Sequence, residues 1–242
     1  MPDNRFGFKF EKEVADNHIL AITTYLNNKY GAGQKIKQTG NNYKNSIADL
    51  EYNGKQIEIK TVTAGSGTYA NLSADKFAKN VGLPTFYELF RKEYITFLKN
   101  KNYDLAYKSR GSNLFSKEEA KDISEMYSWY DEFKELDSKL RKKYIAIIYN
   151  KIINDQSILT KIKKYTILKE GVKKDIADDY MVYNSVSKTI KALTKDDLKK
   201  ISKNNTIITK TDKGIDFGDF RIQLSWKNRT GYNLAIYVFL NK

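Results

Sequence analysis

Hydrophobic and polar positions alternate most regularly over residues 46–61, which read SIADLEYNGKQIEIKT. The pattern predicts two short strands joined by Asn53 and Gly54, because a two-residue type I′ turn needs positive φ at both central positions. Successive side chains of a strand point to opposite faces, so one face of this hairpin should be apolar and the other charged. The apolar residues are Ala48, Leu50, Ile57 and Ile59, and the polar residues are Asp49, Glu51, Gln56, Glu58 and Lys60.

The short turn also predicts the register of the two strands. Leu50 is expected opposite Ile57, and Asp49 opposite Glu58. Opposed Cβ atoms lie about 5 Å apart, so the two carboxylates would face each other with Lys60 one step along the same face. Like charges in that position destabilise a hairpin. A divalent cation bound between them would offset the repulsion.

Outside the hairpin the apolar positions recur every three or four residues, which favours helices. The spacing predicts an opening helix over 8–30 that ends at Gly31, and a helix over 85–100. Capping residues predict further helices after Ser73, after Ser116 and over 195–202. Residues 64–71 are predicted to form a loop, whereas 141–153 and 158–168 fit a helix or a strand equally well.

From residue 205 onward the pattern becomes typical of strands. Residues 220–226 alternate, and the near-continuous apolar run 234–240 is expected to lie at the centre of a sheet, covered on both faces. The expected fold class is α/β or α+β, in one domain over 1–242. A core of about 1–80 plus C-terminal strands at about 205–242 would carry a helical insertion at about 84–200.

Composition narrows the chemistry further. The chain of 242 residues has no Cys, so cysteine zinc sites and disulfides are excluded. Its single His, His18, is the only residue that could serve a Ser-His-Asp triad, and it is interpreted as an ordinary helix residue without a catalytic role. Its 43 Lys and Arg against 29 Asp and Glu give a net charge of +14, which favours a polyanionic partner such as nucleic acid. No apolar run approaches the roughly 20 residues of a membrane span, and a signal-peptide core is missing. A cytoplasmic location without a membrane partner is expected.

Asp49, followed in the next strand by Glu58, Ile59 and Lys60, resembles the catalytic core of the PD-(D/E)xK nuclease superfamily. The resemblance covers 46–61 closely and 8–80 loosely, and Ala48 stands where that family has Pro. It implies a restriction-endonuclease-like core, with a mixed central sheet flanked by helices. It also implies Mg²⁺ as cofactor, held by Asp49, Glu58 and the main-chain carbonyl of Ile59.

The same resemblance implies roles for neighbouring side chains. Lys60 would orient or deprotonate the attacking water, or stabilise the phosphate in the transition state. In some members of the superfamily a Glu from the opening helix joins the site; Glu13 is the first choice here and Glu11 the second. Glu51 and Gln56 share the polar face and are lesser candidates.

The size, the helical insertion and the C-terminal sheet look most like a type II restriction endonuclease, a homodimer on double-stranded DNA. Arg can bind guanine, and Gln or Asn adenine, in the major groove. The predicted DNA contacts are Arg221, Gln223, Lys227, Asn228 and Arg229, with Ser66 and Tyr69 from the loop beside the hairpin. Two alternatives remain open: a structure-specific or repair nuclease with the same core, and a non-enzymatic, basic nucleic-acid-binding protein whose hairpin is only structural.

Overall fold

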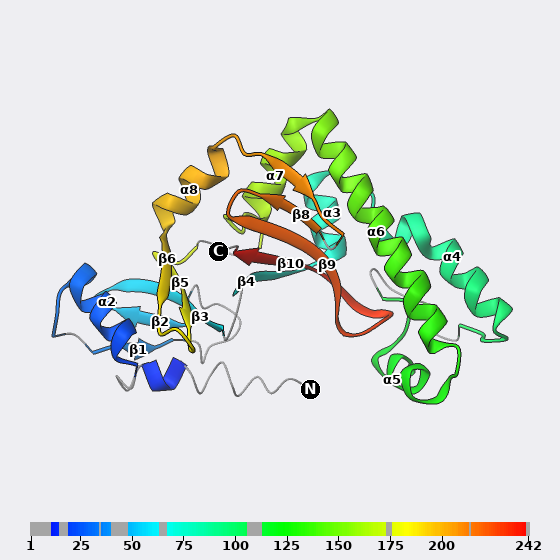
Figure 1. Cartoon of the computed structure of the whole chain (residues 1–242), viewed down its shortest axis with the longest axis horizontal. Helices are drawn as coiled ribbons and strands as arrows, with labels where there is room; N and C mark the ends of the chain where they lie inside the picture. The colour runs from blue at the N-terminus through cyan, green and yellow to red at the C-terminus, as the bar shows by residue number, and fades with distance from the viewer. Residues whose placement is uncertain are drawn as a thin grey trace. The chain divides into compact units, whose positions relative to one another are not determined.

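The structure is a computed structural model and describes residues 11–14, 19–33, 35–39, 48–62, 67–105, 113–172, 176–212 and 214–240. Its class is α+β, as predicted, with two five-stranded sheets (Figure 1). The chain forms two compact units, and each is described by itself. The first unit comprises Met1–Tyr69, Thr166–Asn205 and Leu240–Lys242, and the second comprises Ala70–Tyr165 and Thr206–Phe239.

The hairpin belongs to the sheet of the first unit, whose strand order is β1-β2-β3-β5-β6. β3 pairs antiparallel with β2 and parallel with β5, so it is the central strand of the sheet. Glu58 and Lys60 therefore lie at the middle of the sheet. The bounds are β1 Lys37–Gln38, β2 Leu50–Tyr52, β3 Lys55–Val62, β5 Asp179–Asn184 and β6 Ile190–Thr194.

The predicted hairpin turn is confirmed. Asn53 has φ 48° and Gly54 has φ 72°, as a type I′ turn requires. The paired residues are Leu50 with Ile57, Glu51 with Gln56 and Tyr52 with Lys55, in the predicted register.

The apolar face of the hairpin forms the core of the first unit. Leu50, Ile57 and Ile59 are at most 2% exposed and pack with Ile22 and Leu26 of helix α2, Leu20–Tyr30. Burying each such side chain contributes about 1.5–3 kcal/mol. This packing covers one face of β3 and leaves the acidic side chains on the other.

The ends of the helices in the first unit also follow the sequence. Residues 11–14 and 20–30 are helical, which confirms the predicted opening helix at those positions, but Ile19 is not helical and α2 begins after it. Gly31, with φ 89°, follows its last turn. Helix α8, Lys195–Lys203, begins after Thr194, whose hydroxyl accepts a hydrogen bond from the Asp197 N–H at 3.0 Å.

The sheet of the second unit has the strand order β4-β10-β9-β8-β7. β10 lies between β4 and β9, which confirms the central position predicted for the apolar run. The alternation predicted over 220–226 is also confirmed, because Phe220, Ile222 and Leu224 are buried. The bounds are β4 Gly67–Ser73, β7 Ile208–Lys210, β8 Gly214–Phe217, β9 Phe220–Arg229 and β10 Tyr232–Leu240.

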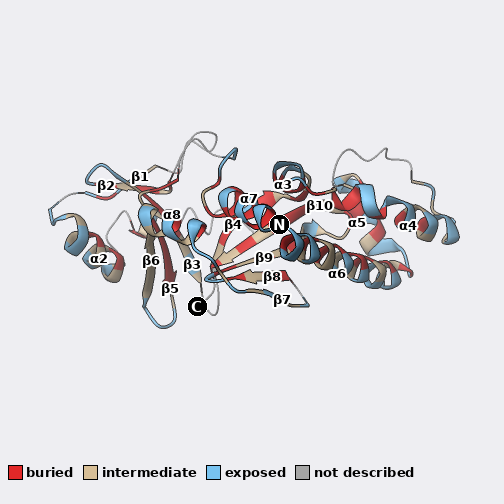
Figure 2. Ribbon diagram, turned by 90° about the horizontal axis from the view of Figure 1, so that it is seen from above, coloured by how far each residue is buried: buried red, intermediate tan, exposed pale blue. Residues whose placement is uncertain are grey.

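The second unit also contains helices, and two of them include the segments whose sequence fitted a helix or a strand equally well. Residues 141–153 fall within α6 and 158–166 within α7. One side of α6 is buried, as Figure 2 shows, at a spacing of three and four residues. None of the helices in the described ranges is long and apolar enough to cross a membrane. The bounds are α3 Ala74–Val81, α4 Phe86–Asn100, α5 Lys117–Met126, α6 Tyr130–Asn154 and α7 Gln156–Thr166.

Three features differ from the sequence prediction. Residues 67–71, predicted as part of a loop, belong to strand β4, where β10 supplies the pairing partner. The segment 84–200 is not wholly helical, because β5 and β6 complete the sheet of the hairpin. The strands after residue 205 do not join that sheet but form a separate one, since the free edge of β3 is taken by β5.

Candidate metal centre

Asp49 lies where the pairing of β2 with β3 ends. The paired register stops at Leu50, and the Asp49 N–H donates to the carbonyl of Ile57 at 3.0 Å. The Asp49 carboxylate then accepts a hydrogen bond from the backbone N–H of Ile59, also at 3.0 Å. The predicted direct pairing of Asp49 with Glu58 is therefore absent from the ladder. The Ile59 N–H bonds to the Asp49 side chain instead of to a main-chain carbonyl of the neighbouring strand.

Lys60 lies between the two predicted carboxylates. Its Nζ is 3.0 Å from Asp49 Oδ2 and 3.6 Å from Glu58 Oε1. Burial lowers the pKa of Lys60, but the charges of Glu58 and Asp49 outweigh that effect and leave the pKa above its ordinary value. Lys60 is thus an ammonium group that offsets the repulsion between the acids.

Glu58 has a second cationic partner, which the sequence did not indicate. Its Oε2 accepts a hydrogen bond from Lys169 Nζ at 2.7 Å. Lys169 follows helix α7 and is 4% exposed, while Glu58 is 7% exposed. The two residues are 111 positions apart, so no local spacing pattern relates them.

Two tyrosines form the buried surroundings of this ion pair. Lys169 Nζ lies 4.6 Å from the ring centroid of Tyr69, and the Tyr69 hydroxyl donates to the carbonyl of Ile167 at 2.6 Å. The Tyr180 ring is 4.4 Å from that of Tyr69, and Tyr180 pairs with Glu58 in the parallel ladder. Burial and then the charge of Glu58 raise the pKa of Tyr69, so it stays a neutral phenol.

Glu11, one of the two glutamates considered in the opening helix, is electrostatically coupled to the site. Burial and then the charge of Asp49 raise the pKa of Glu11, and Lys60 opposes that rise. Gln38 Nε2 donates to Glu11 Oε2 at 3.3 Å. Glu11 precedes the buried Val14 by three positions, which places the two on the same side of a helix. The geometry therefore favours Glu11 over Glu13 as the additional carboxylate.

The lesser candidates on the hairpin make their own contact. Gln56 Nε2 donates to Glu51 Oε2 at 3.3 Å, and the Gln56 N–H donates to Asp178 at 2.9 Å. Lys37 lies 3.7 Å from Glu51. The Glu51 and Gln56 side chains therefore bond to each other, and Glu51 also lies near Lys37. Neither contact involves Lys60.

The donor atoms suit a hard divalent cation. Within the described ranges no three acidic or histidine side chains gather into a metal centre, so the carboxylates of Asp49 and Glu58 would need a main-chain oxygen or water beside them. The N–H and C=O of one strand residue point to the same edge, so the Ile59 carbonyl is directed toward Asp49. Mg²⁺ is usually held by one or two carboxylates and keeps several waters. The set fits Mg²⁺, and metal binding there stays a prediction.

The side chains of β9 that were predicted to contact DNA differ in their exposure and in their partners within the protein. Arg221 is paired with Asp216 at 2.6 and 3.1 Å, and Arg229 contacts Ser124 and Glu125. Lys227 and Asn228 are exposed, and Gln223 is half-buried.

Tyr69 and Ser66 were the two DNA contacts predicted from the loop beside the hairpin. Tyr69 is 2% exposed, which leaves no surface for the predicted DNA contact. Its ring instead packs beneath Lys169. Ser66 lies outside the described residues, as does His18.

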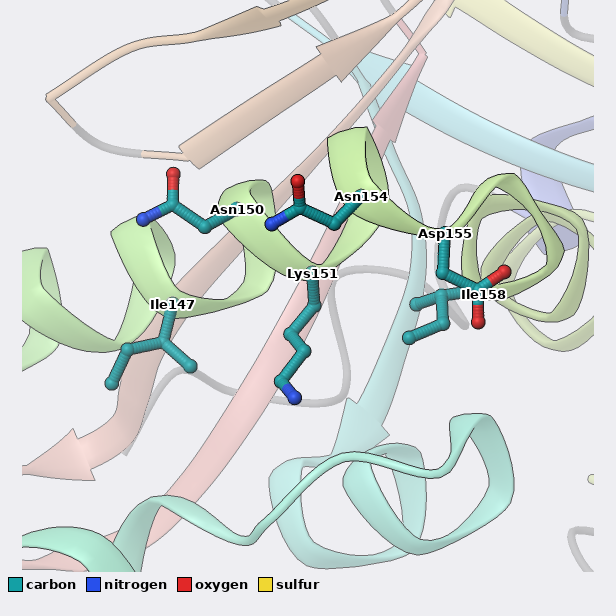
Figure 3. A pocket seen from close by; sticks show the side chains of 6 residues that line it. All are labelled: Ile147, Asn150, Lys151, Asn154, Asp155 and Ile158. Carbon is teal, nitrogen blue, oxygen red and sulfur yellow. The ribbon is translucent and has the colours of Figure 1, made fainter.

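The second unit has a surface hollow of about 340 Å³ beside the junction of α6 and α7, shown in Figure 3. Its only acidic residue is Asp155, so it does not provide an alternative metal centre. The lining residues are Ile147, Asn150, Lys151, Asn154, Asp155 and Ile158.

No protein-family model matches the chain, and no curated protein matches it in sequence. Among solved structures, an HhaI endonuclease in complex with DNA is similar with a TM-score of 0.31 and 11% sequence identity. The likeness spans 94% of this chain and 91% of that chain. A TM-score this low does not establish a common fold.

Proposed function

We propose that the chain is a Mg²⁺-dependent DNA endonuclease whose active site contains Asp49, Glu58 and Lys60. The observation that carries the proposal is the position of Lys60 Nζ, 3.0 Å from one carboxylate and 3.6 Å from the other, on the central strand of a sheet. Lys60 thus contacts two carboxylates, Asp49 and Glu58, that lie on the same side of the strand. They are useful where a cation and a phosphate must be bound.

Hydrolysis of a phosphodiester needs a positioned water, neutralised phosphate charge and a stabilised leaving oxygen. Mg²⁺ bound here would neutralise phosphate charge and make its bound water more acidic. Asp49, Glu58 and the Ile59 carbonyl would hold it, while Glu11 would act on the site from the helix through its charge and not as a ligand. The water adds to phosphorus, the bond from phosphorus to the leaving sugar oxygen breaks, and that oxygen takes up a proton.

Among the residues that the structure describes, Lys60 is well placed to act on the reacting atoms. It is only half-buried, so its ammonium can turn from the carboxylates to a substrate placed beside them. There it would donate hydrogen bonds to the attacking water or to a non-bridging phosphate oxygen. Charge-assisted hydrogen bonds of this kind are about twice as strong as neutral ones.

The net charge of +14 supports a nucleic acid as the substrate. We propose double-stranded DNA, cleaved at a defined sequence in the manner of type II restriction enzymes inside the cell. A homodimer would provide one active site for each strand. Lys227 and Asn228, exposed at the end of β9, would contribute to DNA binding.

The experiment is digestion of several plasmids of different sequence by the purified protein with Mg²⁺. Discrete fragments that disappear on addition of EDTA are expected. A smear would contradict sequence specificity, and preferential cutting of branched junctions would favour a repair nuclease. Intact DNA across all plasmids would contradict the DNase assignment and favour a binding protein.

A substitution of Lys60 provides the matched test of the site. Lys60→Met should remove cleavage, because the ammonium beside the carboxylates is lost. Lys55→Met is the control, since Lys55 lies on the same strand but is exposed and 4.0 Å from Asp178. Cleavage by the Lys60 variant at the rate of the Lys55 variant would contradict the assignment.

A further inference from the structure

The two carboxylate oxygens of Glu58 face different lysines. Glu58 Oε2 is held by Lys169 Nζ at 2.7 Å, whereas Oε1 faces Lys60 Nζ at 3.6 Å. The side chains of Lys169 and Glu58 are 5% and 10% exposed. A buried carboxylate that accepts a hydrogen bond from an ammonium group is held in one orientation. Only one of its oxygens is directed to the side where Asp49 lies.

The position of Lys169 is built into the fold. Its backbone has φ 54°, a left-handed conformation that side-chain-bearing residues seldom adopt. The hydroxyl of Tyr69 bonds to the carbonyl of Ile167 two residues earlier, and the Tyr69 ring lies beneath the ammonium. The Tyr180 hydroxyl in turn donates to the carbonyl of Thr68 at 3.1 Å. Lys169 is therefore a fixed charge rather than a mobile surface lysine.

The two lysines at Glu58 differ in their freedom to leave it. The side chain of Lys60 is 35% exposed, so it can turn away when a divalent cation enters. The side chain of Lys169 is 5% exposed and cannot leave without disturbing the segment that carries it. A cation at Glu58 would thus always be opposed by the charge of Lys169, in surroundings where charges are poorly screened.

We propose that Lys169 is a positioning residue of the nuclease site, which orients Glu58 and weakens the affinity of the site for its divalent cation. The inference rests on the proposed function. Counted by formal charge, the three carboxylates of Asp49, Glu58 and Glu11 are opposed by the two ammonium groups of Lys60 and Lys169, so the net negative charge of the group is small. A divalent cation then binds weakly by itself and more tightly once a DNA phosphate adds negative charge beside it.

The test measures binding of Mn²⁺ alone to the whole protein by electron paramagnetic resonance. Lys169→Met should bind Mn²⁺ about tenfold more tightly, because a nearby charge that opposes the ion is removed. Lys169→Arg keeps the charge and should bind Mn²⁺ as the parent does. Lys188→Met is the matched control, since Lys188 also has a left-handed backbone, with φ 57°, but is exposed.

The rise in unfolding temperature caused by Mn²⁺ provides a second readout, which a merely structural role of Lys169 would not change. Without cation, Lys169→Met should unfold at a lower temperature, because buried Glu58 has lost this partner. Mn²⁺ should then raise the unfolding temperature of the variant by more than it raises that of the parent. Lys169→Gln, which keeps an N–H donor but not the charge, is measured in parallel in case the Met variant does not fold, and should also bind Mn²⁺ more tightly.

Unchanged or weaker Mn²⁺ binding in the charge-removing variants would overturn the role given to Lys169. The assignment of the site itself is tested by Glu58→Gln in the parent. If Glu58→Gln leaves Mn²⁺ binding unchanged, the proposed metal centre fails. If it abolishes binding while Lys169→Met and Lys169→Gln bind as the parent does, only the inference about Lys169 fails.

Discussion

The backbone N–H of Ile59 donates to the carboxylate of Asp49 at 3.0 Å, at the point where pairing between β2 and β3 ends. The bond fixes an acidic side chain against the central strand of a sheet. It also brings that carboxylate to the ammonium of Lys60, the next residue along. One side chain therefore has two separable roles: a hydrogen-bond acceptor for the fold and a negative charge for the site.

Substituting Asp49 separates the two roles. Asp49→Asn keeps an oxygen acceptor for Ile59 but removes the charge, so cleavage should fall at least about 100-fold with little change in the free energy of unfolding. Asp49→Ala should lose cleavage and also about 1–2 kcal/mol of stability, because a charge-assisted hydrogen bond is removed. Urea unfolding and plasmid cleavage measure the two effects. Parental cleavage by Asp49→Asn would refute the role of the charge.

The two helical glutamates are compared in the same way. Glu11→Gln should lower cleavage at limiting Mg²⁺, since the charge of Glu11 acts on both Asp49 and Lys60. Glu13→Gln is the matched control and should cleave as the parent does. The measurement is the Mg²⁺ concentration needed for half-maximal cleavage. A larger shift for Glu13→Gln than for Glu11→Gln would restore the preference for Glu13 that the sequence suggested.

Asp179 anchors α2 to the sheet of the first unit. It is 0% exposed and accepts hydrogen bonds from Lys29 at 2.7 and 2.8 Å and from Tyr30 at 2.6 Å. Asp179→Ala should destabilise the protein by about 1–3 kcal/mol, because Lys29 and Tyr30 lose the buried carboxylate that accepts their hydrogen bonds. Asp196→Ala, on an exposed part of α8, is the control in urea unfolding. Equal unfolding midpoints for the two variants would refute the anchoring role.

DNA binding should depend on Lys227 more than on Arg221. Lys227 is exposed, whereas the guanidinium of Arg221 is engaged by Asp216 at 2.6 Å. Lys227→Ala should weaken DNA binding and lower the salt dependence of log K by about one, as the loss of one phosphate contact would. Arg221→Ala should leave that slope unchanged. Fluorescence anisotropy at several salt concentrations measures both, and a larger change of slope for Arg221→Ala would contradict the prediction.

The hairpin could be predicted from the sequence because its determinants are local. Asn53 and Gly54 select the turn, the turn sets the register, and alternation then separates Leu50 and Ile57 from the acids. The alternation of apolar and polar residues does not indicate at which residue the pairing of β2 with β3 ends. The replacement of a ladder carbonyl by the Asp49 carboxylate was therefore not foreseen.

The rest of the site depends on residues that are distant in sequence. Lys169 reaches Glu58 across 111 positions, and no periodicity connects them. β5 is a six-residue strand, too short for periodicity to distinguish from a turn of helix, although it completes the parallel side of the sheet. The choice of Glu11 over Glu13 also needed the position of Val14 in the core, which the sequence pattern does not reveal.

Glu58→Gln tests the central claim most directly, because Gln has nearly the same shape and lacks only the charge. Cleavage of supercoiled plasmid with Mg²⁺ is measured beside the affinity for the same DNA in the absence of metal. The parent is expected to cut the plasmid, and the variant to bind the DNA with undiminished affinity without cutting it. Equal cutting by parent and variant would contradict the assignment of Glu58 to a nuclease site.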